Sequence, residues 1–373
     1  MSIFKVALVV LMLLLGYLLL LPVSIAPVAW APTPVASLPP PTSLRAIQRI
    51  EPVLPDFVGP EGIAADTDGR IYAGLGDGRL LRLSADFGSC TLLDNSGGRP
   101  LGLAVSSDGA LLIADARSGL LSLGSDGQLR TLSDRADGVA YGFTDDVTVT
   151  ADGSMVYFTD ASARFGFGHH MEDLLEHGRT GRLLRYDVAG NKAETLMQDR
   201  AFANGVALGP DEAYVVFAET WEYKLTRYWL KGEKAGQSDT LVDGLPGFPD
   251  NLSFNGRDRF WVAIYSPRDP MLDRLLPHPA LRKIVARLPE ALRPRPARVA
   301  QILGIDLDGR IVANLRYDGD DAYGYITSVE EQGEYLVVGS LDNTALGRIK
   351  LQDVLSPADA APPPPLRPAC DAG

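Results

Sequence analysis

The chain has 373 residues, of which 46% are hydrophobic and 22% are charged, a composition that is ordinary for a globular protein with a large core. Its formal net charge of −12 argues against a nucleic-acid partner, because nucleic-acid-binding surfaces are basic. Acidity at this level favours solubility and the binding of cations.

The N-terminal region is an uninterrupted apolar stretch. Val6–Trp30 carries no charge, and about 20 apolar residues suffice to span a bilayer. We therefore assign residues 1–30 to a transmembrane anchor. A cleaved signal peptide, with Ala29–Ala31 as its A-x-A-like site, is the alternative. Lys5 places the N-terminus in the cytoplasm, so the sequence predicts a single-pass membrane protein whose globular part is extracytoplasmic.

Two proline-rich segments flank the globular region. Residues 31–56 begin with a dense run of prolines and are predicted to form a semi-rigid spacer that lifts the globular domain off the membrane. Residues 352–373 are rich in Pro and Ala and are predicted to be a disordered tail. Cys90 and Cys370 either pair in an oxidising compartment or remain free thiols; the sequence leaves both open.

One pattern recurs between residues 57 and 351. It consists of an anchor residue, an apolar run, a turn eight residues after the anchor, and a second apolar strand, as from Glu61 to Gly69. The anchors are Glu61, Leu101, Asp145, Asn204, Asp250 and, within a residue, Tyr325. Strand–turn–strand units at such a period predict an all-β fold, a six-bladed β-propeller.

Two insertions interrupt the repeats. Residues 162–180, in blade three, contain His169, His170 and His177, which we expect in a solvated lid or membrane-facing loop because they lack the His-Glu-x-x-His zinc spacing. Residues 270–296, in blade five, are rich in Leu, Arg and Pro and are predicted to form a short amphipathic helix pair. This pair either caps the channel mouth or contacts the bilayer surface.

Four of the anchors bear carboxylate or amide oxygens: Glu61, Asp145, Asn204 and Asp250. Equivalent positions in a propeller lie at one height around the axis, so these side chains should converge in the channel. Three carboxylates without a counter-charge repel one another, and a hard divalent cation resolves the conflict. All-oxygen ligation favours Ca²⁺, although another divalent cation is possible. The alternative is that these residues are polar turn and cap residues.

Several motifs resemble the strictosidine synthase-like family, and within it the branch of the adipocyte plasma membrane-associated proteins, over about residues 58–351. The motifs are Phe143–Val147, Tyr157–Ser162, Gly181–Leu184, Asn204–Leu208 and Gly247–Asn251. The resemblance implies a six-bladed propeller related to gluconolactonases and paraoxonases, which are calcium-dependent hydrolases of lactones and esters.

The resemblance also implies roles for individual residues. Glu61, Asn204 and Asp250 match metal ligands of the family, and Asn251 matches a further ligand of the paraoxonase-like pattern. Asp145 stands where the family usually has Asn; it can still ligate, with added negative charge. The amine–aldehyde condensation of strictosidine synthase relies on a Glu in the last blade. Thr327 aligns there, which argues against that reaction.

We expect metal-assisted hydrolysis of a lactone or ester in the channel. Asp250 is the candidate general base, and Asp146, beside a ligand, is expected to orient the ligands or to join them. One alternative is a non-catalytic, membrane-tethered binding propeller with a structural calcium; another is a strictosidine synthase-like condensing enzyme. The sequence identifies neither the substrate nor the oligomeric state.

Overall fold

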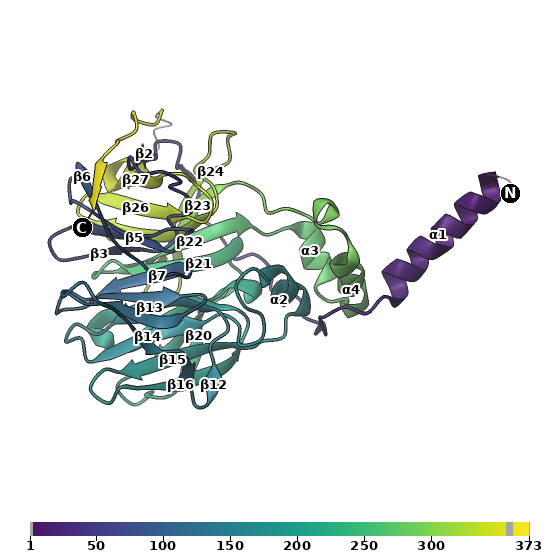
Figure 1. Ribbon diagram of the computed structural model, residues 1–373, viewed down its shortest axis with the longest axis horizontal. Coiled ribbons are helices and arrows are strands. Elements are labelled where there is room, and N and C mark those ends of the chain that lie inside the picture. The colour runs from purple at the N-terminus through teal and green to yellow at the C-terminus, as the bar shows by residue number, and fades with distance from the viewer. Residues whose placement is uncertain (1–2, 356–360, 373) are drawn as a thin grey trace.

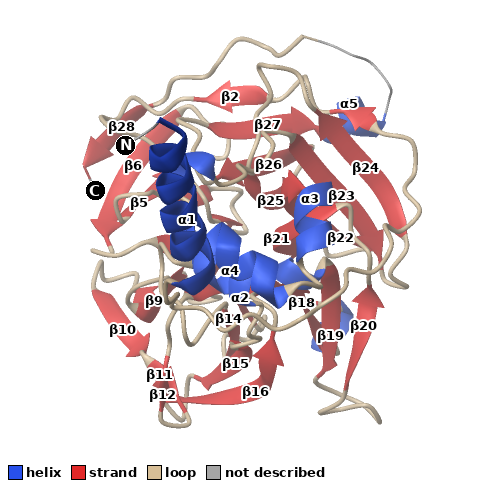
Figure 2. Cartoon of the chain, turned by 90° about the vertical axis from the view of Figure 1, so that its right-hand side faces the viewer, coloured by secondary structure: helices blue, strands red, loops and turns tan. Residues whose placement is uncertain are grey.

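The computed structural model describes residues 3–355 and 361–372 and shows six β-sheets arranged around a central channel (Figure 1 and Figure 2). The innermost strands of successive sheets, β3, β7, β13, β17, β21 and β25, contact one another in a closed ring. The predicted six-bladed β-propeller is confirmed.

Each blade is a sheet of at least four strands, and within each the chain runs from the innermost strand outward. Blade one contains β3 (Ile63–Ala65), β4 (Ile71–Gly74), β5 (Arg79–Leu83) and β6 (Ser89–Asn95). Blade two contains β7 (Pro100–Val105), β8 (Leu111–Asp115), β9 (Gly119–Leu123) and β10 (Leu129–Ser133). Blade three contains β13 (Thr144–Val149), β14 (Met155–Asp160), β15 (Gly181–Asp187) and β16 (Lys192–Arg200). A small ribbon, β11 (Arg135–Ala136) with β12 (Val139–Ala140), connects blades two and three.

The remaining blades follow the same plan. Blade four contains β17 (Ala203–Leu208), β18 (Tyr214–Glu219), β19 (Lys224–Trp229) and β20 (Ser238–Val242). Blade five contains β21 (Gly247–Phe254), β22 (Arg259–Pro267), β23 (Ala300–Asp306) and β24 (Ile311–Tyr317). Blade six takes β25 (Ile326–Gln332), β26 (Tyr335–Ser340) and β27 (Leu346–Lys350) from the end of the repeat region.

The recurring turn of the sequence pattern is an Asp-Gly hairpin in blades one to three. In blade one the Asp66 carboxylate accepts hydrogen bonds from the backbone N–H groups of Asp68 and Arg70, at 3.0 and 2.9 Å. Gly69 follows with φ of +82°, a left-handed conformation that glycine adopts without steric cost. These turns join the first and second strands of each unit and set the pattern that the sequence displays.

Blade six is closed by the N-terminal segment. β2 (Gln48–Ile50) pairs antiparallel with β27 as the fourth strand, and β1 (Thr42–Ser43) pairs parallel with β24 of blade five. The expectation that residues 31–56 form a free spacer is therefore wrong. An unpaired outer edge on β27 would leave backbone groups without partners, and β2 covers it.

The proline-rich part of that segment also lies on the propeller. Ala36 N–H donates to the Gly244 carbonyl at 2.7 Å, and the carbonyl of Thr33 accepts from Arg268 at 2.7 Å. The Asn314 side chain donates to the Pro39 carbonyl at 3.2 Å. Proline-rich backbone offers carbonyl groups but few N–H donors, and the blades supply the missing donors.

The C-terminal region departs from the prediction of a disordered tail. After α5 (Leu351–Leu355), residues 356–360 lie outside the described part. Leu366 then exchanges hydrogen bonds with Arg49 and Glu51, and β28 (Ala369–Ala372) pairs parallel with β6. Both ends of the chain are thus bound to the outer strands of the ring.

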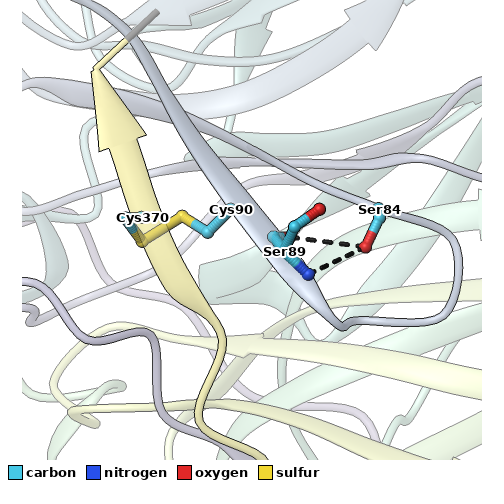
Figure 3. Close-up of a disulfide and its surroundings, with 4 residues drawn as sticks. All are labelled: Ser84, Ser89, Cys90 and Cys370. Carbon is cyan, nitrogen blue, oxygen red and sulfur yellow. Dashed lines mark hydrogen bonds between the residues drawn. A yellow bond between two sulfur atoms is a disulfide. The ribbon is translucent and has the colours of Figure 1, made fainter.

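A disulfide joins Cys90 of β6 to Cys370 of β28 (Figure 3). It resolves the alternative that the sequence left open in favour of pairing. The bond fixes the C-terminal strand to blade one, beside the turn in which Ser84 accepts a hydrogen bond from the Ser89 N–H at 3.0 Å. Disulfides persist in oxidising compartments.

Helices gather at one end of the channel. The two insertions form α2 (His170–Glu176) and the pair α3 (Pro270–Leu275) and α4 (Pro279–Arg287), as predicted for residues 270–296. Short 3₁₀ turns lie at Pro210–Glu212, Thr220–Glu222 and Glu290–Leu292. We call α2, α3 and α4 the lid; Figure 2 looks onto them.

α1 (Ile3–Leu20) projects from the same end of the molecule (Figure 1). Its mean hydropathy is 2.7, and within the described residues it is the one helix long and apolar enough to cross a membrane. A signal sequence would have the same length and composition, so the helix is a candidate span.

Candidate functional site in the central channel

The innermost strands carry the candidate ligands at local irregularities. The pairing register shifts between Thr144 and Val147 in β13, between Ala203 and Val206 in β17, and between Pro249 and Leu252 in β21. A β-bulge re-aims the side chains that it contains. The bulged residues are Asp145–Asp146, Asn204–Gly205 and Asp250–Asn251, so the structure places the predicted positions equivalently in three successive blades.

Glycines allow these bulged segments to approach one another closely. A Cβ on Gly62 would lie 1.9 Å from the Leu101 carbonyl oxygen, and one on Gly102 would lie 2.3 Å from Asp146 Oδ1. A Cβ on Gly205 would lie 2.4 Å from the Asn251 Cα. Backbone therefore packs against backbone around the channel, and a larger residue would widen the ring.

The sixth position of the ring is Thr327, and the expected anchor Tyr325 is wrong. Thr327 Oγ1 donates to the Glu61 carbonyl at 3.3 Å, and its neighbour Ser328 accepts from Asn251 Nδ2 at 3.1 Å. Tyr325 instead stacks on Tyr265, with ring centroids 5.3 Å apart. The tight β25–β26 hairpin shortens the anchor-to-turn spacing in this blade, which misled the count.

Glu61 has a counter-charge that the sequence analysis missed. Arg99, which is 3% exposed, pairs with it, with 2.5 Å between Arg99 Nη2 and Glu61 Oε2. Arg99 also donates to the Gly59 carbonyl at 2.9 Å. The assumption that the carboxylates lack a counter-charge is therefore wrong. The available signal was an arginine two residues before the apolar anchor Leu101.

Asp145, Asn204 and Asp250 are buried together beside this pair. Burial raises the pKa of Asp145 well above its ordinary value, and the charges of Asp250 and Glu61 raise it further. Burial, followed by the charge of Glu61, likewise raises the pKa of Asp250, and the side chain of Asn204 opposes that rise. The charges of Glu61, Asp145 and Asp250 thus act on one another, and the Asn204 side chain acts on Asp250.

Asp146 joins two of the innermost strands. Its two oxygens accept hydrogen bonds from the backbone N–H groups of Val147 and Val206, both at 2.8 Å, and so join β13 to β17. Burial raises the pKa of Asp146 to about 7. Asn251 donates to Ser328, while its Oδ1 is buried without a hydrogen-bond partner.

The donor set fits a hard divalent cation in its chemistry. All donors are oxygens, and Asp250 Oδ1 is a buried carboxylate oxygen without a hydrogen-bond partner. Among the described residues, however, no three His, Cys, Asp or Glu side chains cluster as a metal site. The pairing of Glu61 with Arg99 accounts for part of this, since it commits one carboxylate to the guanidinium.

Replacing Asp145 with Asn should weaken calcium binding by about tenfold or more and stabilise the calcium-free protein by about 1–3 kcal/mol. The substitution removes one negative charge from the donors and one buried charge from the fold. Calorimetric titration with calcium, paired with melting curves in chelator, measures both effects.

Asp152→Asn is the matched control, because Asp152 lies exposed in the turn of the same hairpin. If Asp145→Asn binds calcium as tightly as the unmodified protein, Asp145 is not a ligand. Asn251 or water would then complete the ligand set.

Below the ring, the channel continues as a cavity of about 280 Å³. Residues of all six innermost strands line it, including Asp146, Asn251, Ser253 and Glu330. Burial raises the pKa of Glu330 to about 8, and the Ser253 hydroxyl opposes the rise. The sequence analysis missed Glu330 because it followed only the anchor position of each repeat. Glu330 lies at a different position of the strand, and the other blades have no acidic residue there to draw attention to it.

Above the ring, aromatic residues separate the site from the lid. Phe143, Phe202 and Phe248 each stand two residues before a candidate ligand. Phe143 packs edge-on against Phe202, with centroids 5.3 Å apart, and Trp221 bridges from Phe202 at 4.3 Å to Phe248 at 5.8 Å. These side chains are buried and exclude water from the carboxylates below.

A second cavity, of about 270 Å³, lies between the lid and Phe248. Its lining is largely apolar and includes Met171 and Leu174 of α2, Leu272 and Leu275 of α3, and Val285 of α4. This cavity adjoins the strand that carries Asp250 and so offers an apolar surface near the candidate site.

The histidines of the first insertion differ from one another. His169 and His170 are exposed, as expected for a solvated loop. His177 is buried instead. It lies at the C-terminal end of α2 with φ of +55°, and its ring stacks on Trp30, with centroids 4.7 Å apart. The N-terminal segment therefore covers His177 and fixes the end of α2.

Asp173 of α2 should make stability depend on pH. Burial raises its pKa to about 6, although its Oδ1 accepts a hydrogen bond from Trp221 Nε1 at 2.7 Å. The folded state thus holds a proton that the unfolded state releases near the ordinary pKa of 3.8, so stability falls as pH rises from about 4 to above 6.

Asp173→Asn keeps an acceptor for Trp221 without the buried charge. It should raise the free energy of unfolding by about 2–3 kcal/mol at pH 8 and leave it nearly unchanged at pH 4, since one pKa unit corresponds to about 1.4 kcal/mol. Urea unfolding of both proteins across this range tests it; an equal gain at both pH values would exclude titration of Asp173 as the cause.

The fold and the channel define a class: six-bladed propellers that carry oxygen donors on their innermost strands. Comparison with known proteins then gives the family. A strictosidine synthase family model matches residues 145–233, and a model of the strictosidine synthase-like N-terminal region matches residues 39–83. Protein STRICTOSIDINE SYNTHASE-LIKE 6 of Arabidopsis thaliana is 36% identical over 329 residues, 85% of each chain. The chain belongs to the strictosidine synthase-like family.

Other relatives agree with this assignment. The adipocyte plasma membrane-associated protein of Homo sapiens is 31% identical over 366 residues, covering 91% of this chain and 87% of that one. Among solved structures, a gluconolactonase from Xanthomonas campestris superposes with a TM-score of 0.59 at 15% identity, over 87% of this chain and 98% of the other. Regucalcin, a calcium-binding protein from Agrobacterium tumefaciens, gives 0.57 at 17% identity, over 83% and 94%. At such identity these structures support the fold alone.

Proposed function

We propose that this protein is a membrane-anchored, calcium-dependent hydrolase of lactones or esters, with its site at Glu61, Asp145, Asn204 and Asp250. One observation carries the proposal: Asp250 Oδ1 is buried, lacks a hydrogen-bond partner, and belongs to a ring of oxygen donors. A bound cation would polarise the substrate carbonyl and acidify an attacking water.

The chain's own residues supply the remaining steps. Asp250 accepts the proton as the water oxygen bonds to the carbonyl carbon. The bond between that carbon and the alkoxy oxygen then breaks, and the proton passes to the leaving alkoxide, which departs as an alcohol or, from a lactone, remains as a hydroxyl. The side chain of Asn204 favours the ionised form of Asp250, and Asp146 holds β13 against β17. The apolar cavity beside Phe248 would receive an apolar part of the substrate.

Calcium dependence is tested with the purified full chain on phenyl acetate and a panel of lactones. Turnover should be lost in chelator and restored by calcium. Absence of turnover across the panel, with calcium still raising the melting temperature, would instead support a membrane-tethered binding propeller with a structural ion. Condensation of an amine with an aldehyde is disfavoured, because Thr327 offers no carboxylate at the last-blade position.

The proposed location is a single-pass membrane protein with an extracytoplasmic propeller. Lys5 lies at the N-terminal side of α1, and the Cys90–Cys370 disulfide suits an oxidising compartment. N-terminal sequencing of the mature protein should recover a chain that retains α1. A mature N-terminus near Pro32 would show that α1 is a cleaved signal sequence.

A further inference from the structure

The lid is bound directly to the end of the candidate span. Tyr17 Oη donates to the Arg287 carbonyl at 2.8 Å, and Arg287 donates to the carbonyls of Leu21 and Leu18 at 2.6 and 2.8 Å. If α1 spans the bilayer, its last turn lies where the hydrocarbon core ends. These contacts then hold α4 at the depth of the lipid headgroups.

A buried arginine fixes the other side of α4. Arg282 is fully buried and donates to the Leu175 carbonyl of α2 at 3.0 Å and to the Val28 carbonyl of the N-terminal segment. α4 therefore has an inner side bonded to α2 and to the N-terminal segment, and an outer side turned away from them. The lid cannot turn its outer side inward without losing these bonds.

The segment that holds α3 and α4 is basic, in a protein whose net charge is −12. Residues 270–298 contain two acidic residues, Asp273 and Glu290, and seven basic ones: Arg274, Arg282, Lys283, Arg287, Arg293, Arg295 and Arg298. Within the described part of the chain, Arg274, Lys283 and Arg295 have no ion-pair partner. Such a local excess of positive charge attracts anionic partners outside the chain.

The same segment exposes apolar side chains. Among the side chains that the structure describes, every exposed leucine or methionine beyond residue 21 lies here: Met271, Leu281 and Leu292, with 62%, 44% and 67% of their surface exposed. These residues lie beside the end of the candidate span. Basic residues interspersed with exposed apolar ones are typical of a surface that lies in the bilayer interface.

We infer that the basic lid surface, comprising Met271, Arg274, Leu281, Lys283, Leu292 and Arg295, docks on a bilayer that contains anionic phospholipid. The basic groups bind the lipid phosphates, and the three apolar side chains enter the boundary between headgroups and acyl chains. Figure 2 views the face that would meet the membrane. The channel end with the lid then faces the lipid. This inference rests on the proposed membrane anchor and not on the proposed hydrolysis.

The test uses the full chain in proteoliposomes with a spin label at one introduced cysteine; the native cysteines are occupied by their disulfide. One label replaces Ala291, beside Leu292; the reference label replaces Ser107, exposed in the β7–β8 turn at the opposite end of the channel. Accessibility to oxygen and to a water-soluble nickel complex gives the depth of each label. Vesicles are phosphatidylcholine alone or phosphatidylcholine with phosphatidylserine.

The Ala291 label should enter the interface, more fully in vesicles with phosphatidylserine, while the Ser107 label stays in water. Arg274→Glu/Lys283→Glu/Arg295→Glu should lower the ratio of docked to free label by about tenfold or more, since each basic residue near an anionic surface contributes attraction. Lys192→Glu/Lys234→Glu/Arg310→Glu, an equal change in charge among exposed residues at the opposite end, should leave the ratio unchanged.

Raising the salt concentration on the unmodified protein should reproduce the effect of the first triple variant without any substitution. An Ala291 label as accessible to nickel as the Ser107 label, in both kinds of vesicle, would overturn the inference. The Ala291 label could instead reach the same depth in neutral and anionic vesicles, with no change on charge reversal or added salt. That result would overturn the recognition of anionic lipid.

Discussion

Asp250→Asn should reduce the turnover of any ester or lactone that the protein hydrolyses by at least about 10²-fold. The substitution keeps the shape of the side chain but removes the carboxylate that we assign as the general base, and positioned bases contribute about 10²–10⁴-fold to such reactions. The loss should appear in kcat. Initial rates at saturating calcium, with calcium binding measured on the same samples, separate loss of the base from loss of the ion.

Asp258→Asn is the matched control, because Asp258 lies exposed in the β21–β22 turn of the same hairpin. It should retain full turnover. Should Asp250→Asn also retain it while still binding calcium, the base lies elsewhere in the channel, and Asp146 and Glu330 become the next residues to test.

Arg99→Met should destabilise the calcium-free protein by about 3–5 kcal/mol, because it leaves Glu61 buried without its counter-charge. Adding Glu61→Gln should recover a large part of this loss, since the double variant leaves no carboxylate alone. Saturating calcium should also reduce it, because the ion supplies positive charge to the same carboxylates. Urea unfolding of the four proteins of this cycle, each with and without calcium, measures the coupling.

Arg130→Met gives the comparison for an exposed pair. Arg130 bonds to Asp126 with both side chains about half exposed, so its removal should hardly change the free energy of unfolding. If Arg99→Met costs no more than Arg130→Met, then Glu61 is protonated or solvated in the folded state and the charge balance inferred for the ring is wrong.

The sequence by itself was sufficient for the blade count and for four positions of the ring. Both depend on local spacing: a turn eight residues after an anchor sets where the first strand of a unit ends, as from Glu61 to Gly69. Chain repetition then places equivalent residues at equivalent positions. The count failed at Tyr325, where a tighter hairpin changed the spacing and Thr327 took the position.

The tertiary structure alone decided the features that join residues far apart in the chain. The pairing of β2 with β27 closes the ring with a segment predicted to be a spacer, and Cys90 meets Cys370 across 280 residues. The partner of Glu61 is Arg99, which lies in the next blade and 38 residues further along the chain. Local turns and periodicity are encoded in neighbouring residues, whereas these contacts exist only after the ring has closed and brought its two ends and adjacent blades together.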